Sequence, residues 1–213
     1  GKVAVVAGVC HGFIGNRMLM PRQVEAMKLL MEGATPAQID KVHTDFGMPM
    51  GPFQMSDLAG VDIGWHRDPT RIENVRDALA AVGRWGQKTG KGFYDWNVDG
   101  KRLWPDLTAH FPVAAQQPPQ QELIDRLLFA QANEAARCYE EKVLRSVADA
   151  NIGSIFGWGF APFHGGALQF INAMGAAAFV KRSRELALRF GARFEPAAVV
   201  VQQADRGGHF SDA

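Results

Sequence analysis

The sequence has few of the features that mark a secreted, metal-binding or nucleic-acid-binding protein. Its 213 residues include only two cysteines, Cys10 and Cys138, too few for a disulfide framework and without the paired spacing of a structural zinc site. Lys and Arg (23) nearly balance Asp and Glu (22), so the net charge of +1 gives no field that attracts nucleic acid or an anionic membrane. Residues 1–8 have no cleavage-type ending. We therefore expect a cytoplasmic globular protein with no nucleic-acid partner and no signal peptide.

One long segment, residues 151–180, lacks charged residues and is long enough to span a bilayer. Pro162 and several glycines interrupt it, and polar side chains such as Asn151 and Gln169 would be unfavourable in hydrocarbon. Two buried helices joined by a turn explain the segment better, so we expect no membrane span.

Helical periodicity dominates the first half of the chain. A helix from about Arg17 to Gly33 is predicted by an apolar stripe on one face, formed by Met20, Val24, Met27 and Met31. A second helix is predicted from a cap pattern, Thr35 followed by Pro36 and Gln38. Two prolines, Pro52 and Pro69, predict the starts of two more helices, the latter ending at Gly83.

Helical periodicity is absent between residues 84 and 121, which we interpret as an ordered loop followed by a Pro- and Gln-rich linker. Helices then resume around Leu123, after the cap-like Ser146, after Pro162 and before Gly191. The chain is therefore predicted to be all-α.

An internal repeat is visible when the sequence is shifted by about 110 residues. The shift aligns helix, capped helix, aromatic-Gly loop and Pro-started helix in the same order, with matched pairs Arg17 and Arg126, Glu25 and Glu134, Asp40 and Asp149, and residues 46–53 and 156–163. It predicts two tandem helical domains, 1–112 and a degenerate copy at 120–205, with a linker at 113–119 and a tail at 206–213. Each copy would cover the apolar face of the other, as two subunits do in a homodimer, giving a pseudo-dimer. The alternative is two unrelated helical domains.

Three motifs resemble the C-terminal region of 3-hydroxyacyl-CoA dehydrogenases. They are Gly-Phe-Ile-Gly-Asn-Arg at 12–17, the Gly-Met-Pro-Met-Gly-Pro-Phe loop at 47–53 with the segment 57–62, and Gly-Gln-Lys-Thr-Gly-Lys-Gly-Phe-Tyr at 86–94. The two-copy arrangement is similar to that of the α-subunits of bacterial fatty-acid oxidation complexes and the peroxisomal multifunctional enzymes. The resemblance implies a fold like the C-terminal domain of these enzymes and of 6-phosphogluconate dehydrogenase, and a role in oxidising 3-hydroxyacyl-CoA to 3-ketoacyl-CoA in β-oxidation.

The resemblance makes Asn16 the catalytic and substrate-binding candidate, because a carboxamide can hydrogen-bond the substrate near its reacting carbon. The competing interpretation is a helix cap, since Asn often precedes an apolar helical run. The repeat places Asp125 opposite Asn16, so only the first half would be catalytic. Met50 and Phe53, in the loop that faces the cleft in relatives, and Phe156, where some relatives have a substrate-contacting Tyr, are further substrate-binding candidates.

The same resemblance assigns the base, a His supported by a Glu, to an upstream NAD-binding domain. His11 has no Glu at a suitable spacing and is better explained as a turn residue. Gly86, Gly90 and Gly92 match neither a dinucleotide loop nor a P-loop, so NAD is expected to bind upstream and no metal is expected. Lys88 and Lys91 could contact coenzyme A but are more simply solvated.

We therefore expect the helical part of a dehydrogenase that binds acyl-CoA, is inactive alone, and has an upstream nucleotide-binding domain as its partner. The resemblance also implies an enoyl-CoA hydratase domain and a thiolase subunit in the parent enzyme. The alternative is a non-catalytic acyl-CoA-binding or helical interaction module.

Overall fold

The computed structural model describes residues 1–212 and divides into two compact units. The first unit consists of residues 1–25, 47–49 and 125 onward, and the second of residues 26–46 and 50–124. The described residues form mostly helices with a single two-stranded sheet, which confirms the predicted all-α class.

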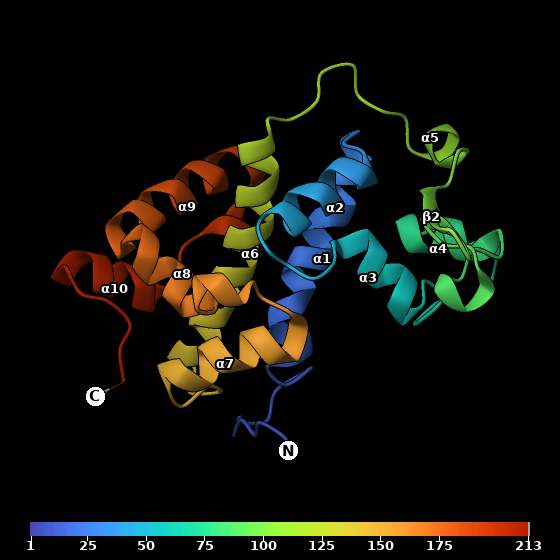
Figure 1. Ribbon diagram of the computed structural model, residues 1–213. Helices are drawn as coiled ribbons and strands as arrows, with labels where there is room; N and C mark the ends of the chain where they lie inside the picture. Colours follow the sequence, from blue (N-terminus) through green and yellow to red (C-terminus); the bar gives the residue numbers. More distant parts are fainter. Residues whose placement is uncertain (213) are drawn as a thin grey trace. The chain divides into compact units, whose positions relative to one another are not determined.

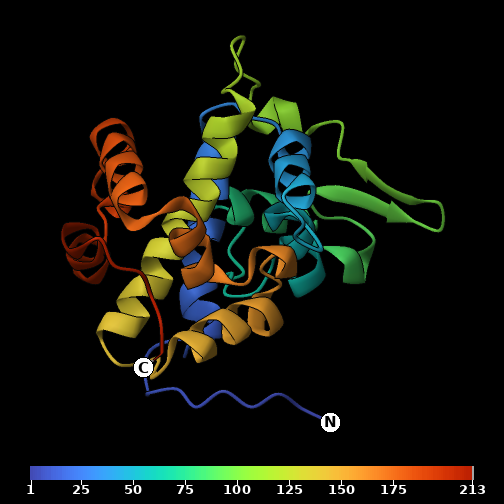
Figure 2. The same ribbon diagram turned by 60° about the vertical axis from the view of Figure 1, so that its left-hand side comes forward.

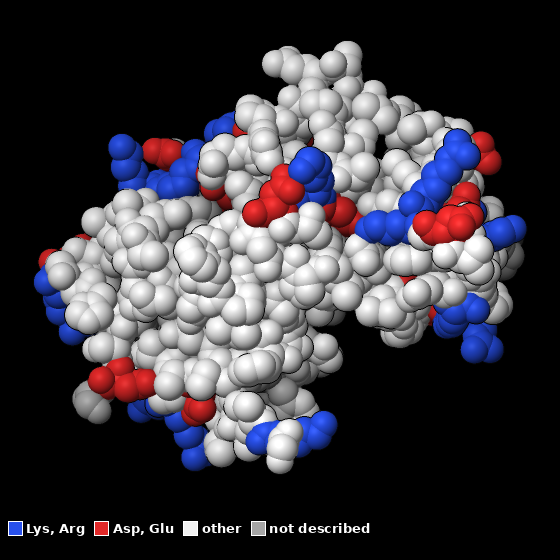
Figure 3. All heavy atoms as spheres, in the orientation of Figure 1, with Lys and Arg blue, Asp and Glu red and all other residues white. Residues whose placement is uncertain are grey.

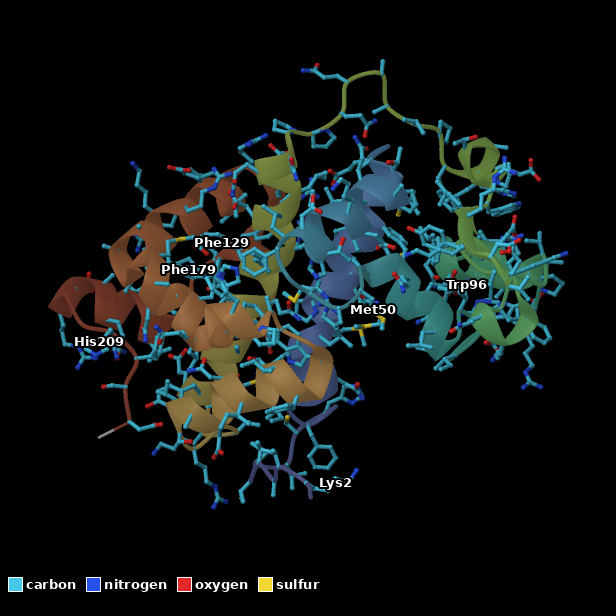
Figure 4. The ribbon with its side chains drawn as sticks, viewed as in Figure 1. Lys2, Met50, Trp96, Phe129, Phe179 and His209 are labelled. Atoms are coloured by element: carbon cyan, nitrogen blue, oxygen red, sulfur yellow. The ribbon has the colours of Figure 1, made fainter. Side chains whose placement is uncertain are left out.

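The first unit is built on two long helices, α1 and α6, which lie side by side in Figures 1 and 2. α6 stacks its Phe129 ring on Phe179 of α9, with centroids 4.4 Å apart (Figure 4). The helices that belong wholly or partly to this unit are α1 (Gly15–Met31), α6 (Gln120–Glu140), α7 (Val147–Trp158), α8 (Ala167–Met174), α9 (Ala176–Phe190) and α10 (Ala198–Arg206), with 3₁₀ turns η2 (Pro162–His164) and η3 (Ala192–Phe194).

The second unit combines short helices with a β-hairpin. The hairpin pairs Tyr94 with Leu103 and Asn97 with Gly100 in antiparallel register. Its elements are α2 (Pro36–Asp45), α3 (Pro52–Ala59), α4 (Val75–Ala81), the 3₁₀ turn η1 (Gln87–Thr89), β1 (Tyr94–Asn97), β2 (Gly100–Leu103) and α5 (Leu107–His110).

Two helix starts follow the capping chemistry of the sequence. Thr35 and Gln38 form a reciprocal capping box with Pro36 at the first helical position of α2. Ser146 caps α7 by accepting the Asp149 backbone N–H at 2.9 Å. Local side-chain hydrogen bonds therefore set these boundaries, as predicted.

Two other helix starts differ from the prediction. α4 begins at Val75 instead of Pro69, because the Asn74 side chain accepts the N–H groups of Arg76 and Asp77. Pro162 begins only a 3₁₀ turn, and α8 starts at Ala167 after two left-handed glycines. In each case the residues that hold the first helical N–H groups, not the proline, fix the boundary.

Two further elements, the hairpin and α10, were not predicted from the sequence. The hairpin was signalled by Asp99-Gly100 between aromatic residues. α10 contains the β-branched run 199–201, which weakens a helix prediction. Part of the segment predicted as a tail is ordered, because Phe210 is buried and the Asp212 carboxylate accepts the N–H groups of Val147 and Ala148.

The uncharged stretch 151–180 forms most of α7, all of α8 and the start of α9. The space-filling view shows few charged side chains over α7 and α8 (Figure 3). Among the described residues, no helix is both long and apolar enough to cross a bilayer.

A buried carboxylate, Asp57, organises the second unit. It accepts the N–H groups of Phe93 and Tyr94 at 2.8 and 2.9 Å and the Trp96 indole N–H at 2.9 Å. A Cβ at Gly92 would overlap the Asp57 carboxylate, so that position requires glycine. The glycine-rich loop at 86–94 thus wraps around a side chain of α3.

We expect Asp57→Asn to lower the free energy of unfolding by about 3 kcal/mol, because an amide offers one acceptor oxygen to three buried donors. Urea denaturation would measure the change. Asp99→Asn, at an exposed position in the hairpin turn, is the control and should change stability by less than about 0.5 kcal/mol. Equal effects would show that Asp57 does not organise the loop.

Burial raises the pKa of Asp57. The folded state therefore holds the proton to higher pH than the unfolded state, and this contribution to stability is lost as pH rises through the raised pKa. Since the ordinary Asp pKa is about 3.9, the stability gap between wild type and Asp57→Asn should be wider near that pH than at neutrality. Thermal unfolding across this range tests the sign, and a gap that widens towards neutrality contradicts it.

Candidate functional site

A cavity of about 670 Å³ lies within the first unit, beside the N-terminal part of α1. It has walls from α1, the segment before it, α6 and η3. The lining residues are Cys10, His11, Gly12, Asn16, Arg17, Met20, Pro21, Val24, Ala130, Glu134, Arg137 and Arg193.

The α1 wall of the cavity is a stripe of exposed side chains at four-residue intervals. Asn16 is exposed, Met20 is 54% exposed and Val24 is 44% exposed. The spacing places them on one face of the helix, as the sequence predicted for Met20 and Val24. The opposite face buries Arg22 and Glu25 completely. The apolar stripe of this part of α1 thus lines a cavity instead of entering the core.

Buried ion pairs explain why the charged face of α1, and not its apolar face, is buried. The Glu25 carboxylate receives Arg126 Nε and Arg193 Nε, each at 2.6 Å. The Arg22 guanidinium lies 5.6 Å from the Trp158 ring centroid. Charged side chains can be buried when they are paired, so hydropathy alone does not identify the buried face.

The carboxamide of Asn16 faces the cavity without a protein partner. Asn16 is the second residue of α1, and its backbone N–H donates to Gly12 O at 3.2 Å. Its side chain makes no hydrogen bond among residues 1–212, so the geometry differs from that of a capping Asn, whose side chain accepts a backbone N–H. Both its donor and its acceptor are available to a ligand, and its catalytic role stays a prediction.

The neighbouring residue, Arg17, fixes this end of α1 to α6. Its Nε donates to Glu134 at 2.7 Å, and its two terminal nitrogens bind both oxygens of Glu141 at 2.7 and 2.9 Å. These hydrogen bonds, the Glu141 pair first, raise the pKa of Arg17, while Arg17 lowers the pKa of Glu141. The planar guanidinium therefore positions the residue next to Asn16 in a defined geometry.

Two further residues of the segment before α1 line the cavity. His11 makes no ion pair with a carboxylate in the described part of the chain. Cys10 donates its thiol hydrogen to Phe13 O at 3.3 Å, and both cysteines are free thiols. Burial raises the pKa of Cys138 to about 12, which makes its thiolate a minor species at neutral pH.

The other predicted substrate residues do not line this cavity. Phe156 belongs to the first unit, on α7, and is 72% exposed. Met50 and Phe53 belong to the second unit: Met50 is half-buried in the loop before α3 (Figure 4), and Phe53 is fully buried with its ring centroid 4.8 Å from that of Phe93. Their substrate contacts stay predictions.

The lysines of the glycine-rich loop differ in their surroundings. Lys88 pairs with Asp62, whereas Lys91 is exposed and takes part in the loop through its backbone. The same loop uses Gly86 and Gly92 to approach Asp57 closely, so these glycines serve packing and do not form a dinucleotide cradle. No cluster of metal-ligating side chains occurs among the described residues.

Sequence reasoning found Asn16 but missed the rest of its cavity. Glu134 and Arg137, which lie more than 100 residues away on α6, carried no motif. A usable signal was the repeat itself, because it pairs Arg17 with Arg126 and Glu25 with Glu134, four charged residues that meet between α1 and α6.

Residues 12–96 match the family model described as "3-hydroxyacyl-CoA dehydrogenase, C-terminal domain". These residues belong to that oxidoreductase family, which confirms the sequence-based recognition.

Known relatives agree with this family. A peroxisomal bifunctional enzyme from Danio rerio is 37% identical over 212 residues, and the match covers 85% of this chain but only 30% of that protein. The dehydrogenase part of multifunctional enzyme 1 from C. elegans is 29% identical with a TM-score of 0.58, covering 72% of this chain and 38% of that one. A 3-hydroxybutyryl-CoA dehydrogenase from Escherichia coli K12 has the same fold: TM-score 0.73 at 22% identity, covering 95% and 61%.

We expect Arg17→Met to lower the free energy of unfolding by about 2 kcal/mol, because it leaves two carboxylates close together without their shared guanidinium. Lys41→Met is the matched control, since it breaks the solvent-exposed Lys41–Asp45 pair and should cost less than about 1 kcal/mol. Urea midpoints would measure both. Similar values for the two variants would mean that Arg17 does not anchor α1.

Proposed function

We propose that this chain is the substrate-binding part of an NAD-dependent (S)-3-hydroxyacyl-CoA dehydrogenase that converts 3-hydroxyacyl-CoA to 3-ketoacyl-CoA in fatty-acid β-oxidation. The observation that carries the proposal is the Asn16 carboxamide, which lies unpartnered at a cavity within a family motif. The names of the relatives support the reaction class.

In this proposal Asn16 orients the substrate. Its N–H₂ group donates a hydrogen bond to the oxygen on the third carbon, and this bond strengthens as that oxygen gains charge. Arg17 acts as a positioning residue, because its ion pairs hold the first turn of α1 against α6. When bound, NAD would provide the nicotinamide that accepts the hydride, and a base would remove the hydroxyl proton. In this proposal both the NAD site and the base belong to an upstream domain.

The glycines at 86–92 do not fit a dinucleotide, because a Cβ at Gly86 or Gly92 would overlap atoms of Asp57. This supports the assignment of NAD to a separate domain. The chain spans 30% of the length of the Danio rerio relative. A hydratase domain and a thiolase subunit remain proposed partners. A cytoplasmic location also remains a proposal, since the Danio rerio relative is named peroxisomal.

The test is NADH oxidation with acetoacetyl-CoA. We expect no turnover by this chain alone and turnover when it is fused behind the NAD-binding domain of a relative. Asn16→Ala in the fusion should lower kcat about a hundredfold, as loss of one oxyanion donor does. Gln116→Ala, at an exposed linker position, is the control.

Turnover by the isolated chain that depends on Asn16 would show that the base and nucleotide site lie in these residues. A fusion whose activity is insensitive to Asn16→Ala would favour a non-catalytic acyl-CoA-binding or interaction module.

We also propose that residues 1–112 and 120–205 are repeats packed as a pseudo-dimer, joined by the linker 113–119. Reciprocal ion pairs support it: Arg17 binds Glu134 on α6, and Arg126 of α6 binds Glu25 on α1. Exchange of equivalent partners is the signature of a two-fold relation.

A shared capping device supports the repeat independently. The Asp40 carboxylate on α2 accepts the first N–H groups of α3, from Phe53 and Gln54. The Asn151 amide oxygen on α7 accepts those of Leu168 and Gln169 at the start of α8. The aligned Asp149 does not do this: the capping residue is shifted by two residues from the sequence match, and the capped helix start by five.

Cleavage at a protease site inserted in the linker tests the repeat. We expect the two pieces to co-elute as a folded complex, because each covers the apolar face of the other. An uncut chain with the same insertion is the control. Separation of the pieces with one of them still folded would instead indicate independent helical domains.

A further inference from the structure

The cavity beside α1 has an apolar stretch of wall between two polar ends. Asn16 lies at one polar end, next to the Arg17–Glu134 pair. Met20, Pro21 and Val24 continue the wall along α1 without a charged group. The exposure of Met20 and Val24 leaves apolar surface on this wall uncovered within the unit.

The ion pairs between α1 and α6 locate the facing wall. Arg126 meets Glu25 and Glu134 meets Arg17, so the two helices run antiparallel. Ala130 lies midway between Arg126 and Glu134 and therefore stands at the level of the middle of the stripe. Its small side chain leaves room for a ligand between the helices.

Arg193 closes the end of the cavity near Val24. Its Nε donates to the buried Glu25 carboxylate at 2.6 Å, and another of its nitrogens donates to Phe190 O. These bonds fix the guanidinium in place and satisfy part of its charge. The apolar stretch therefore has a defined length, about 12 Å from Asn16 to Val24 at 1.5 Å per helical residue.

We infer that the Asn16–Met20–Val24 stripe binds the acyl chain of the substrate and that its length is limited at Val24, where Arg193 closes the cavity. This rests on the proposed function, because it requires the oxygen on the third carbon to lie at Asn16. From there a hydrocarbon chain would run along Met20, Pro21 and Val24 on α1 and past Ala130 on α6. The stripe matches a chain of medium length, up to about that of a dodecanoyl group, since about 12 Å of helix faces it.

The test is calorimetric titration of this chain with 3-hydroxyacyl-CoAs from butyryl to tetradecanoyl. Affinity should rise about fourfold for each methylene buried and then level off near dodecanoyl. Val24→Trp should move the plateau to a shorter chain without weakening 3-hydroxybutyryl-CoA binding. Met20→Ser should reduce the gain per methylene, and Leu188→Ser, at an exposed residue that does not line the cavity, is the control.

The outcomes separate the two proposals. Asn16→Ala could lower the affinity for every acyl-CoA while Val24→Trp and Met20→Ser show the same dependence of affinity on chain length as wild type. In that case the assignment of the stripe is wrong and the proposed function stands. If wild type binds none of the series, the assignment of the stripe fails, whereas the proposed function is decided by turnover of the fusion. A plateau that shifts equally in Leu188→Ser also overturns the assignment.

Discussion

The ion pairs between α1 and α6 are the constraint on which the site depends. Glu25 and Arg126 are completely buried, and removing two charges from water is costly unless each finds its partner in a good geometry. Any slip of α1 along α6 would leave a buried charge unpaired. The pairs therefore favour one relative position of the two helices, and that position sets Asn16 and the apolar stripe on the wall of the cavity.

The two ends of this contact differ in their exposure. Arg17 and Glu134 are each about one-sixth exposed, and Glu141 is half exposed, so this end is partly solvated. A solvated ion pair contributes less to the free energy of folding, but it is compatible with a cavity beside it. The buried pair at Glu25 lies at the close-packed end of the contact. A substrate site at the end with Asn16 is compatible with a stable unit for this reason.

Much of the local structure followed from the sequence because it is decided by nearby residues. Thr35 with Gln38, and Ser146, cap helices through side chains within three positions. The starts of α4 and α8 did not follow, because a proline permits a helix start but does not supply the hydrogen bonds that Asn74 and Asn151 provide. The exposed face of α1 could not be inferred either, since its opposite face is buried by pairing with residues far along the chain.

The same distinction applies to the site: residues in a local motif could be predicted, and residues brought together by packing could not. Asn16 lies in a motif, so a resemblance could indicate it, whereas the lining by Ala130, Glu134 and Arg193 depends on how three segments pack. The substrate candidates Met50 and Phe53 were chosen from a loop motif. Phe53 is buried in the core of its unit against Phe93, so the motif also contains a packing residue, and its substrate contact stays a prediction.

The capping device common to both proposed repeats shows why one of them needs a charge. Asp40 serves three donors, the N–H groups of Phe53 and Gln54 and the Tyr94 hydroxyl at 2.7 Å, so both of its oxygens must accept. Asn151 serves two N–H groups with one oxygen, which an amide can do. Burial raises the pKa of Asp40, so the carboxylate is retained at a cost in solvation. The third donor, Tyr94, comes from the glycine-rich loop that Asp57 also holds, so Asp40 links helix capping to the closure of that loop.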